Sequence, residues 1–240
     1  MARNLLPALT LTLTTLLLVT GSGAFAAASK TKLAIGVIVF PGSISINYLG
    51  PLQFFGNLPT DRFAVSVRMI GNSSGQAVSD TNGITSYKTV GFGSISADDK
   101  VDLLLIPGGN GLESVVTNPT FVKFIAAFSK KATTVMSVCT GAMILAKTGL
   151  LDGRKATTNK QTFNKIKATY PAVKWVNQAR WVTDGKFWTS SGVFAGTDMA
   201  RAYISARFGK TLAAQVSHYL EFVAITDPSN DPFTSNTGSR

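Results

Sequence analysis

The chain contains a single cysteine and a single histidine among its 240 residues, and this scarcity excludes several kinds of chemistry. One cysteine, Cys139, cannot form a disulfide within the chain, and a protein of this size does not depend on disulfides for stability. His, Cys, Asp and Glu nowhere cluster with the spacing of metal ligands, so we expect no bound metal. The first apolar run is not followed by a G-x-G-x-x-G fingerprint, which argues against a dinucleotide. We therefore expect a protein that works without a cofactor.

Acidic side chains are also scarce, with 12 Asp and Glu against 23 Lys and Arg and a formal net charge of +11. A basic balance is common in nucleic-acid binding proteins, but here no nucleic-acid motif accompanies it. We interpret the basic residues as a solvated face and predict no nucleic-acid partner, with attraction to an anionic cell surface as the alternative. The densest basic stretch consists of Arg154, Lys155, Lys160, Lys165, Lys167 and Lys174.

The chain lacks a long uninterrupted apolar run, and its first residues have the layout of a secretory signal. Arg3 provides a positive start, residues 11–19 an apolar centre, and Ala24-Phe25-Ala26 a small-x-small cleavage site. The apolar centre falls short of the ~20 residues that cross a bilayer. We predict no transmembrane anchor, a signal peptide over residues 1–26 that is removed, and a secreted protein that acts on a small-molecule substrate.

From Lys32 onward, buried-strand patterns alternate with helical patterns. The runs at 32–40, 101–109 and 133–139 are mainly apolar, which is typical of parallel strands buried on both faces. Strands that alternate with helices favour a doubly wound α/β fold, with helices on both sides of a mostly parallel sheet. We predict a single domain over residues 32–226 and an irregular C-terminal tail over residues 227–240.

In such a fold, sites form beyond the carboxyl ends of the strands, and three of these ends carry unusual residues. They are Phe40-Pro41-Gly42, Pro107-Gly108-Gly109 and Val138-Cys139-Thr140. A cysteine directly between a strand and a helix lies in a tight turn, next to the unpaired N–H groups of the helix. Helix N-termini lower a cysteine pKa to ~3.5–7.5, so we predict a reactive thiolate.

The glycine pair complements the cysteine. Gly108 and Gly109 let backbone N–H groups approach a substrate atom without obstruction by a side chain. Together with the N–H of Thr140, these groups can hold a developing negative charge. We therefore predict that Gly108 contacts the substrate and that Gly109 and Thr140 stabilise the reacting atoms.

The segment around the cysteine resembles the nucleophile elbow of the ThiJ/PfpI family, a branch of the class I glutamine amidotransferase-like superfamily. This segment reads SVCTGAMILAKTGLLDGRKATT, and LLLIPGGNG, FPGSISINYLGPLQFF and WTSSGVFAGTDMARAYI resemble further family segments in the same order. LEFVAITDPSNDPF resembles the closing segment of the isonitrile hydratase-like subgroup. The resemblance implies a flavodoxin-like fold, a homodimer, and a cysteine as the reactive centre.

Carried over by residue, the resemblance implies that Cys139 is the nucleophile, that Thr140 supplies a backbone N–H and a hydroxyl contact, and that Gly109 supplies the opposing N–H. Two positions depart from the family. Asn47 stands where isonitrile hydratase-like members have an acidic residue; an amide cannot shuttle a proton, but it can donate a hydrogen bond to a thiolate or orient a water molecule. Asn159 stands where many relatives have a histidine, so we expect no Cys–His dyad.

Four further features have a structural and a functional interpretation. Ser190 ends a predicted strand, where it can line the pocket and bind substrate or cap the next helix. Asp198 is expected to compensate a helix dipole, and His218 to lie at the surface. We expect core or dimer contacts for three tryptophans, which are Trp175, Trp181 and Trp188.

These observations support two hypotheses of different classes. The first is a cofactor-free, cysteine-dependent hydratase or hydrolase that acts on a small electrophile, with conversion of an isonitrile to an N-formamide as the most specific version. The second is a secreted, non-catalytic protein that binds a ligand or responds to oxidation through Cys139. A peptidase ranks third, because no base for the leaving amine is visible.

Overall fold

The computed structural model describes residues 29–75, 77–81, 83, 85–96 and 99–234. The predicted signal peptide lies outside these residues. Within them, no helix is both long enough and apolar enough to span a membrane.

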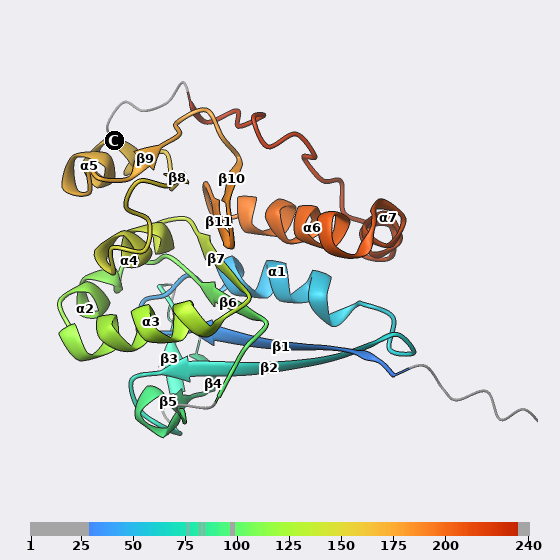
Figure 1. Cartoon of the computed structure of the whole chain (residues 1–240), viewed down its shortest axis with the longest axis horizontal. Coiled ribbons are helices and arrows are strands. Elements are labelled where there is room, and N and C mark those ends of the chain that lie inside the picture. Colours follow the sequence, from blue (N-terminus) through green and yellow to red (C-terminus); the bar gives the residue numbers. More distant parts are fainter. Residues whose placement is uncertain (1–28, 76, 82, 84, 97–98, 235–240) are drawn as a thin grey trace, which may run out of the picture.

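A seven-stranded sheet forms the centre of the protein, in the order β10-β11-β7-β6-β1-β2-β5 (Figure 1). All neighbouring strands are parallel except β10 and β11, which pair antiparallel at one edge. This confirms the predicted doubly wound, mostly parallel sheet. The strands are β1 (Thr31–Ile38), β2 (Phe63–Gly71), β5 (Val90–Gly91), β6 (Leu103–Ile106), β7 (Thr134–Val138), β10 (Trp181–Asp184) and β11 (Phe187–Ser190).

Two small strand pairs lie outside the central sheet. β3 (Ala77–Ser79) and β4 (Thr85–Lys88) form an antiparallel hairpin. β8 (Lys155–Ala156) and β9 (Lys174–Trp175) pair in parallel after the cysteine corner. The second pair matters for the site, because residues 157–160 follow β8 directly.

Helices cover both faces of the sheet (Figure 1). The first face carries α1 (Ile46–Gly56), α6 (Ala195–Phe208) and α7 (Lys210–Tyr219), whose buried side chains belong to one hydrophobic cluster. The second cluster includes side chains from the helices of the opposite face. The remaining helices are α2 (Leu112–Val116), α3 (Pro119–Lys131), α4 (Gly141–Lys147), α5 (Phe163–Thr169) and the 3₁₀ turn η1 (Phe92–Ser94).

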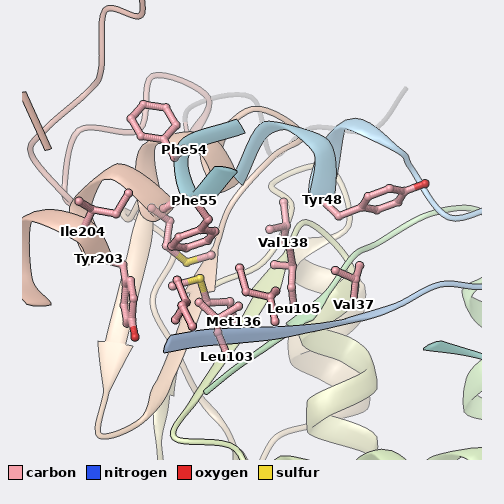
Figure 2. Close-up of a cluster of buried hydrophobic side chains, with 14 of the residues drawn as sticks. Val37, Tyr48, Phe54, Phe55, Leu103, Leu105, Met136, Val138, Tyr203 and Ile204 are labelled. Carbon is pink, nitrogen blue, oxygen red and sulfur yellow. The ribbon is translucent and has the colours of Figure 1, made fainter. Parts of the chain in front are cut away.

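The strands supply alternate side chains to the two clusters, as the two-residue period of a strand requires. Leu103 and Leu105 of β6 face α1 and α6, whereas Leu104 belongs to the opposite cluster. Figure 2 shows the first cluster, in which Phe55 of α1 packs edge-on against Tyr203 of α6 with ring centroids 5.9 Å apart. The sheet is thus the middle layer of a single domain.

The strand order brings the predicted site residues together at the carboxyl ends of the central strands. From β1 the chain moves outward to β2, then returns past β1 to build β6, β7 and β11 on the other side. The carboxyl ends of β1, β6 and β7 therefore lie next to one another. Ligand sites of open α/β sheets form at such a reversal of strand order.

The chain after α7 returns to the domain. Residues 222–234, which we name the C-terminal strap, run back over β10 towards β8 (Figure 1). The N–H of Ile225 donates to a carboxylate oxygen of Asp198 at 3.0 Å, and the N–H of Arg180 donates to the carbonyl of Pro228 at 2.7 Å. Residues 227–234, which we predicted as part of an irregular tail, have an irregular backbone but are fastened to the domain.

Candidate active site

Cys139 occupies a strained turn between β7 and α4. Its φ of +59° makes it one of two described residues other than glycine with a left-handed backbone. Such a conformation costs an L-residue roughly 1–2 kcal/mol, and strain of this kind concentrates at functional sites. The tight strand-to-helix turn that the sequence predicted is present.

The glycine pair meets the cysteine corner at close range. A Cβ atom on Gly108 would lie 2.6 Å from the backbone nitrogen of Thr140 and 3.1 Å from the Cβ of Cys139. A Cβ atom on Gly109 would lie 2.1 Å from the carbonyl oxygen of Gly42. The pair is therefore required by the close approach of the elbow on one side and the loop after β1 on the other.

The predicted lowering of the Cys139 pKa is wrong. The residue is only 3% exposed, and this burial raises the pKa of the thiol above its ordinary value. Hydrogen bonds from the Thr140 N–H and from the side chains of Asn159 and Thr140 lower the pKa, but by less. Desolvation of the charged form outweighs the donors at the start of a seven-residue helix, so the sulfur keeps its proton at neutral pH.

The expected anion-stabilising groups lie together, but each has a partner within the protein. The Gly109 N–H donates to the Thr140 hydroxyl at 3.1 Å, and the Thr140 N–H is directed at the sulfur. Rotation of the Thr140 side chain would release the Gly109 N–H for a bound molecule. The structure thus brings Cys139, Thr140 and Gly109 into one cluster.

Asn47 acts on the glycine turn. Its side chain is fully buried; its Oδ1 accepts from the Gly108 N–H at 3.0 Å and its Nδ2 donates to the Val193 carbonyl at 3.3 Å. Neither bond reaches the thiol. The amide therefore joins the loop after β6 to the segment before α6. This link needs a side chain with both an acceptor and a donor, as an amide has.

Asn159 is the polar neighbour of the thiol that we did not include among the predicted site residues. Its Oδ1 accepts from the N–H groups of Gln161 and Thr162 at 3.0 and 3.3 Å, so its NH₂ group is the donor to sulfur. The preceding residue, Thr158, donates its hydroxyl to the Cys139 carbonyl at 2.9 Å. The signal was present in the sequence, because Asn159 replaces the histidine of many relatives.

A cavity of about 530 Å³ opens beside the elbow. Its wall mixes polar groups with apolar side chains, and its charged lining residues, Glu113 and Lys165, are exposed. Cys139, Thr140 and Gly109 belong to the wall, whereas the predicted residues Asn47, Gly108 and Ser190 do not. The other lining residues are Ile44, Asn110, Leu112, Met143, Asn159, Gln161, Thr162, Ile166, Thr169 and Val193.

Ser190 and Asp198 have structural positions. The Ser190 hydroxyl is buried and donates to the Ser137 carbonyl at 3.3 Å, and Phe194 occupies the N-cap of α6, so neither predicted role of Ser190 is supported. Asp198 pairs with Arg180 at 2.8 Å inside the protein. Burial raises the pKa of this carboxyl, and Arg180 opposes the rise. His218 is exposed at the end of α7 and is not part of the cavity wall.

A flavodoxin-like sheet with a cysteine in a left-handed turn after a central strand defines the class of α/β proteins with a nucleophile elbow. Residues 34–206 match the model of the DJ-1/PfpI family, and the chain belongs to this family. The predicted ThiJ/PfpI membership and fold are therefore confirmed.

Relatives within this family differ in what they are named for. The chain is 29% identical to the isonitrile hydratase of Pseudomonas putida over 190 residues, which cover 79% of this chain and 78% of the relative. It is 33% identical over 125 residues to the HTH-type transcriptional regulator CdhR of Pseudomonas aeruginosa, covering 52% of this chain but 37% of the regulator.

Solved structures of the family agree on the fold. A ThiJ/PfpI family protein from Pseudomonas syringae superposes with a TM-score of 0.72 at 26% identity, covering 89% of this chain and 83% of that one. Drosophila melanogaster DJ-1beta superposes with a TM-score of 0.69 at 19% identity, covering 80% and 100% respectively. Since the chain is similar both to an enzyme and to a transcriptional regulator, its activity has to be argued from the site.

Proposed function

We propose that the protein is a cofactor-free, cysteine-dependent enzyme that hydrates a small electrophile, and that an isonitrile is its substrate. One observation carries the proposal. The Cys139 thiol forms part of the cavity wall, is surrounded by neutral hydrogen-bonding groups, and keeps its proton because burial raises its pKa. Similarity to an isonitrile hydratase over most of both chains supports the choice of substrate.

A protonated thiol suits this substrate, because the terminal carbon of an isonitrile accepts a nucleophile and a proton at the same atom. The sulfur of Cys139 bonds to that carbon and the S–H proton moves to it, which forms a thioformimidate, Cys–S–CH=N–R. Water then adds to the carbon and its hydrogens pass to the nitrogen and, as the S–C bond breaks, back to sulfur. The products are the N-formamide and the free thiol, with one water consumed.

The surroundings of the thiol match these steps. The hydroxyl of Thr140 and the amide of Asn159 lie against the sulfur, where they can orient the attacking water. Apolar side chains of Ile44, Met143 and Val193 line the same cavity and provide contacts for an apolar substituent. The protonated thiol supplies the hydrogen that the carbon gains, so this addition needs no second acid.

The redox-responsive alternative is less well supported. Peroxide oxidises the thiolate, and a buried thiol with a raised pKa contains little thiolate at neutral pH. A binding role is favoured by the similarity to a transcriptional regulator, which covers about half of this chain.

We also propose that the protein is exported through residues 1–26 and that it forms a homodimer. Exposed apolar side chains support the second point, since Phe194, Tyr219 and Val223 are 63%, 72% and 95% exposed beside α6 and α7. N-terminal sequencing of the secreted protein and light scattering in solution test the two proposals.

The hydratase proposal is tested by supplying the purified protein with isonitriles, α-oxoaldehydes and amides and by measuring products by mass spectrometry. We expect N-formamides from isonitriles, and no turnover by Cys139→Ala. The Cys139 peptide should gain the full mass of the isonitrile during turnover. The rate should stay level at neutral pH and fall as the thiol ionises. Equal formamide production by wild type and Cys139→Ala, or none by the folded wild type, would refute the proposal.

A further inference from the structure

Lys160 and Asp231 form an ion pair inside the protein, although both residue types are rarely buried. The Lys160 Nζ lies 3.6 Å from Oδ2 of Asp231, with the two side chains 3% and 0% exposed. The ammonium also donates to the Thr157 hydroxyl at 2.7 Å and to the Ala179 carbonyl at 2.9 Å. Two hydrogen bonds and one ion pair, from three parts of the chain, therefore hold one ammonium group.

This ammonium lies next in sequence to the group that contacts the thiol. Lys160 follows Asn159, whose side chain donates to the Cys139 sulfur, and Thr158 donates to the Cys139 carbonyl. The N–H of Thr157 is held by the Thr189 hydroxyl at 2.8 Å. Residues 157–160 are thus anchored at both ends, and Asn159 lies between these anchors, next to Lys160.

The carboxylate of the pair comes from the C-terminal strap. The strap begins with Phe222, whose ring packs edge-on against Phe54 at 5.4 Å, and it continues through the bonds of Ile225 and Pro228. The side chain of Gln178 donates to the Ser229 carbonyl at 2.9 Å. Asp231 is the one buried residue among residues 222–234, whose other members are exposed or half-buried, and its carboxylate connects the strap to residues 157–160.

Stability alone does not explain this pair, because removing two charges from water offsets most of their attraction. Burial lowers the pKa of Lys160 to about 8, and Asp231 counteracts this effect. Arg180 also lowers the Lys160 pKa, while it pairs with Asp198. Asp231 and Arg180 are the charged side chains that act on the Lys160 ammonium in the described residues. A buried pair of this kind fixes geometry more than it adds stability.

We infer that Lys160 and Asp231 are positioning residues for Cys139: the pair holds Asn159 against the thiol and makes the C-terminal strap part of the site. The inference rests on the proposed function, since it assumes that the thiol reacts. The reactive state of the site then requires a docked strap.

The test measures ionisation and reactivity of the thiol and needs no substrate. Because Cys139 is the only cysteine, thiolate absorbance and the rate of alkylation by iodoacetamide both report on this residue, with Cys139→Ser as the blank. Both are followed against pH in the full mature chain for wild type, Asp231→Asn and Lys160→Met. Asp227→Asn is the matched control, because this exposed strap carboxylate bonds only to Ser229 in the described structure.

Loss of the Asn159 hydrogen bond raises the thiol pKa, since that bond favours the thiolate. We therefore expect both Lys160→Met and Asp231→Asn to shift the titration upward and to slow alkylation by about 3–10-fold at mildly alkaline pH, as half a pKa unit to one unit implies. A through-space charge effect predicts opposite signs for the two variants. In Asn159→Ala, the further change Asp231→Asn should add no shift.

Three outcomes would overturn the inference. The thiol titration could be unchanged in the folded variants, or it could shift in opposite directions in Lys160→Met and Asp231→Asn. The shift of Asp231→Asn could also add to that of Asn159→Ala. Asp231→Glu should restore the wild-type profile, and Lys160→Arg should do so in part; these two variants decide the matter if Lys160→Met fails to fold. Lower thermal stability with an unchanged profile would mean a structural role only. The test uses no substrate, so it is independent of the hydratase assay. If the titration shifts as expected but no hydratase activity is found, only the proposed function is rejected. If hydratase activity is found but the titration does not shift, only the positioning role of Lys160 and Asp231 is rejected.

Discussion

At the residue scale, the thiol of Cys139 shows how burial and hydrogen bonding compete. Three donor groups surround the sulfur, yet removal from water raises its pKa more than the donors lower it. The sulfur is therefore protonated at neutral pH. Its raised pKa also adds stability that is fully present below the pKa of the unfolded thiol and is lost as pH rises through the folded value.

Asn47→Asp should destabilise the protein at neutral pH. An ionised carboxylate still accepts from the Gly108 N–H, but its second oxygen would face the Val193 carbonyl where the amide now donates at 3.3 Å. The loss should be about 1–3 kcal/mol. The pKa of the new buried carboxyl should be raised, so the deficit should shrink in acidic buffer and grow as pH rises through that pKa.

Denaturant unfolding in mildly acidic and mildly alkaline buffer measures this effect. The control is Asn57→Asp, because the half-buried Asn57 makes a similar but solvent-exposed donor bond to the Gln53 carbonyl at 2.8 Å. We expect less than about 0.5 kcal/mol for the control. A buried variant as stable as the control at both pH values would contradict the role of Asn47 in holding the glycine turn.

At the scale of elements, α6 has to approach β7 closely for the elbow to form where it does. The contact runs through Gly196 of α6 and Val138, the residue before Cys139. A Cβ atom on Gly196 would lie 2.6 and 2.9 Å from the two methyl groups of Val138. A valine side chain has little freedom to move away, because branching at Cβ restricts its χ1 angle.

Gly196→Ala should therefore destabilise the protein by about 1–3 kcal/mol, the usual cost of overpacking a core. By helix propensity alone, alanine would stabilise the helix by about 1 kcal/mol over glycine. The sign of the change in unfolding free energy therefore separates overpacking from helix propensity. Gly192→Ala is the matched control, because no atom lies within 4 Å of its Cβ position. Equal unfolding midpoints for both variants in thermal denaturation would argue against the close α6–β7 contact.

At the scale of the whole molecule, the C-terminal strap ties together parts of the chain that are distant in sequence. It connects α6 through Asp198, the start of β10 through Arg180, and the segment after β8 through Lys160. Residues after 226 are therefore bonded to the domain, although they have an irregular backbone.

A chain that ends at residue 226 should be less stable than one that ends at residue 234. Truncation leaves Lys160 buried without its carboxylate, and breaking a buried pair costs about 3–5 kcal/mol. For a chain of this size, that should lower Tm by about 6–20 °C. Calorimetry of the two chains makes the comparison, and equal Tm values would show that the strap contributes nothing to the stability of the fold.

Much of the fold follows from local patterns. The mainly apolar runs that became β1, β6 and β7 are typical of strands covered on both faces. Asn118 lies just before Pro119 at the start of α3, and its side chain accepts from the Phe121 N–H at 3.1 Å. The elbow was predictable for the same reason, because a strand and a helix that meet at Cys139 leave one tight turn between them. Asn159 and Asp231 could not be placed in this way, since their partners are distant in the chain.

The sequence by itself determined the alternation of strands and helices, the position of the cysteine corner and the family, because these depend on short stretches and their order. Only the tertiary structure decided the protonation of Cys139, the partners of Asn47 and the burial of Asp231. These properties depend on which groups from distant segments exclude water from a given atom. Desolvation is set by the whole surroundings of an atom, and no local pattern contains them.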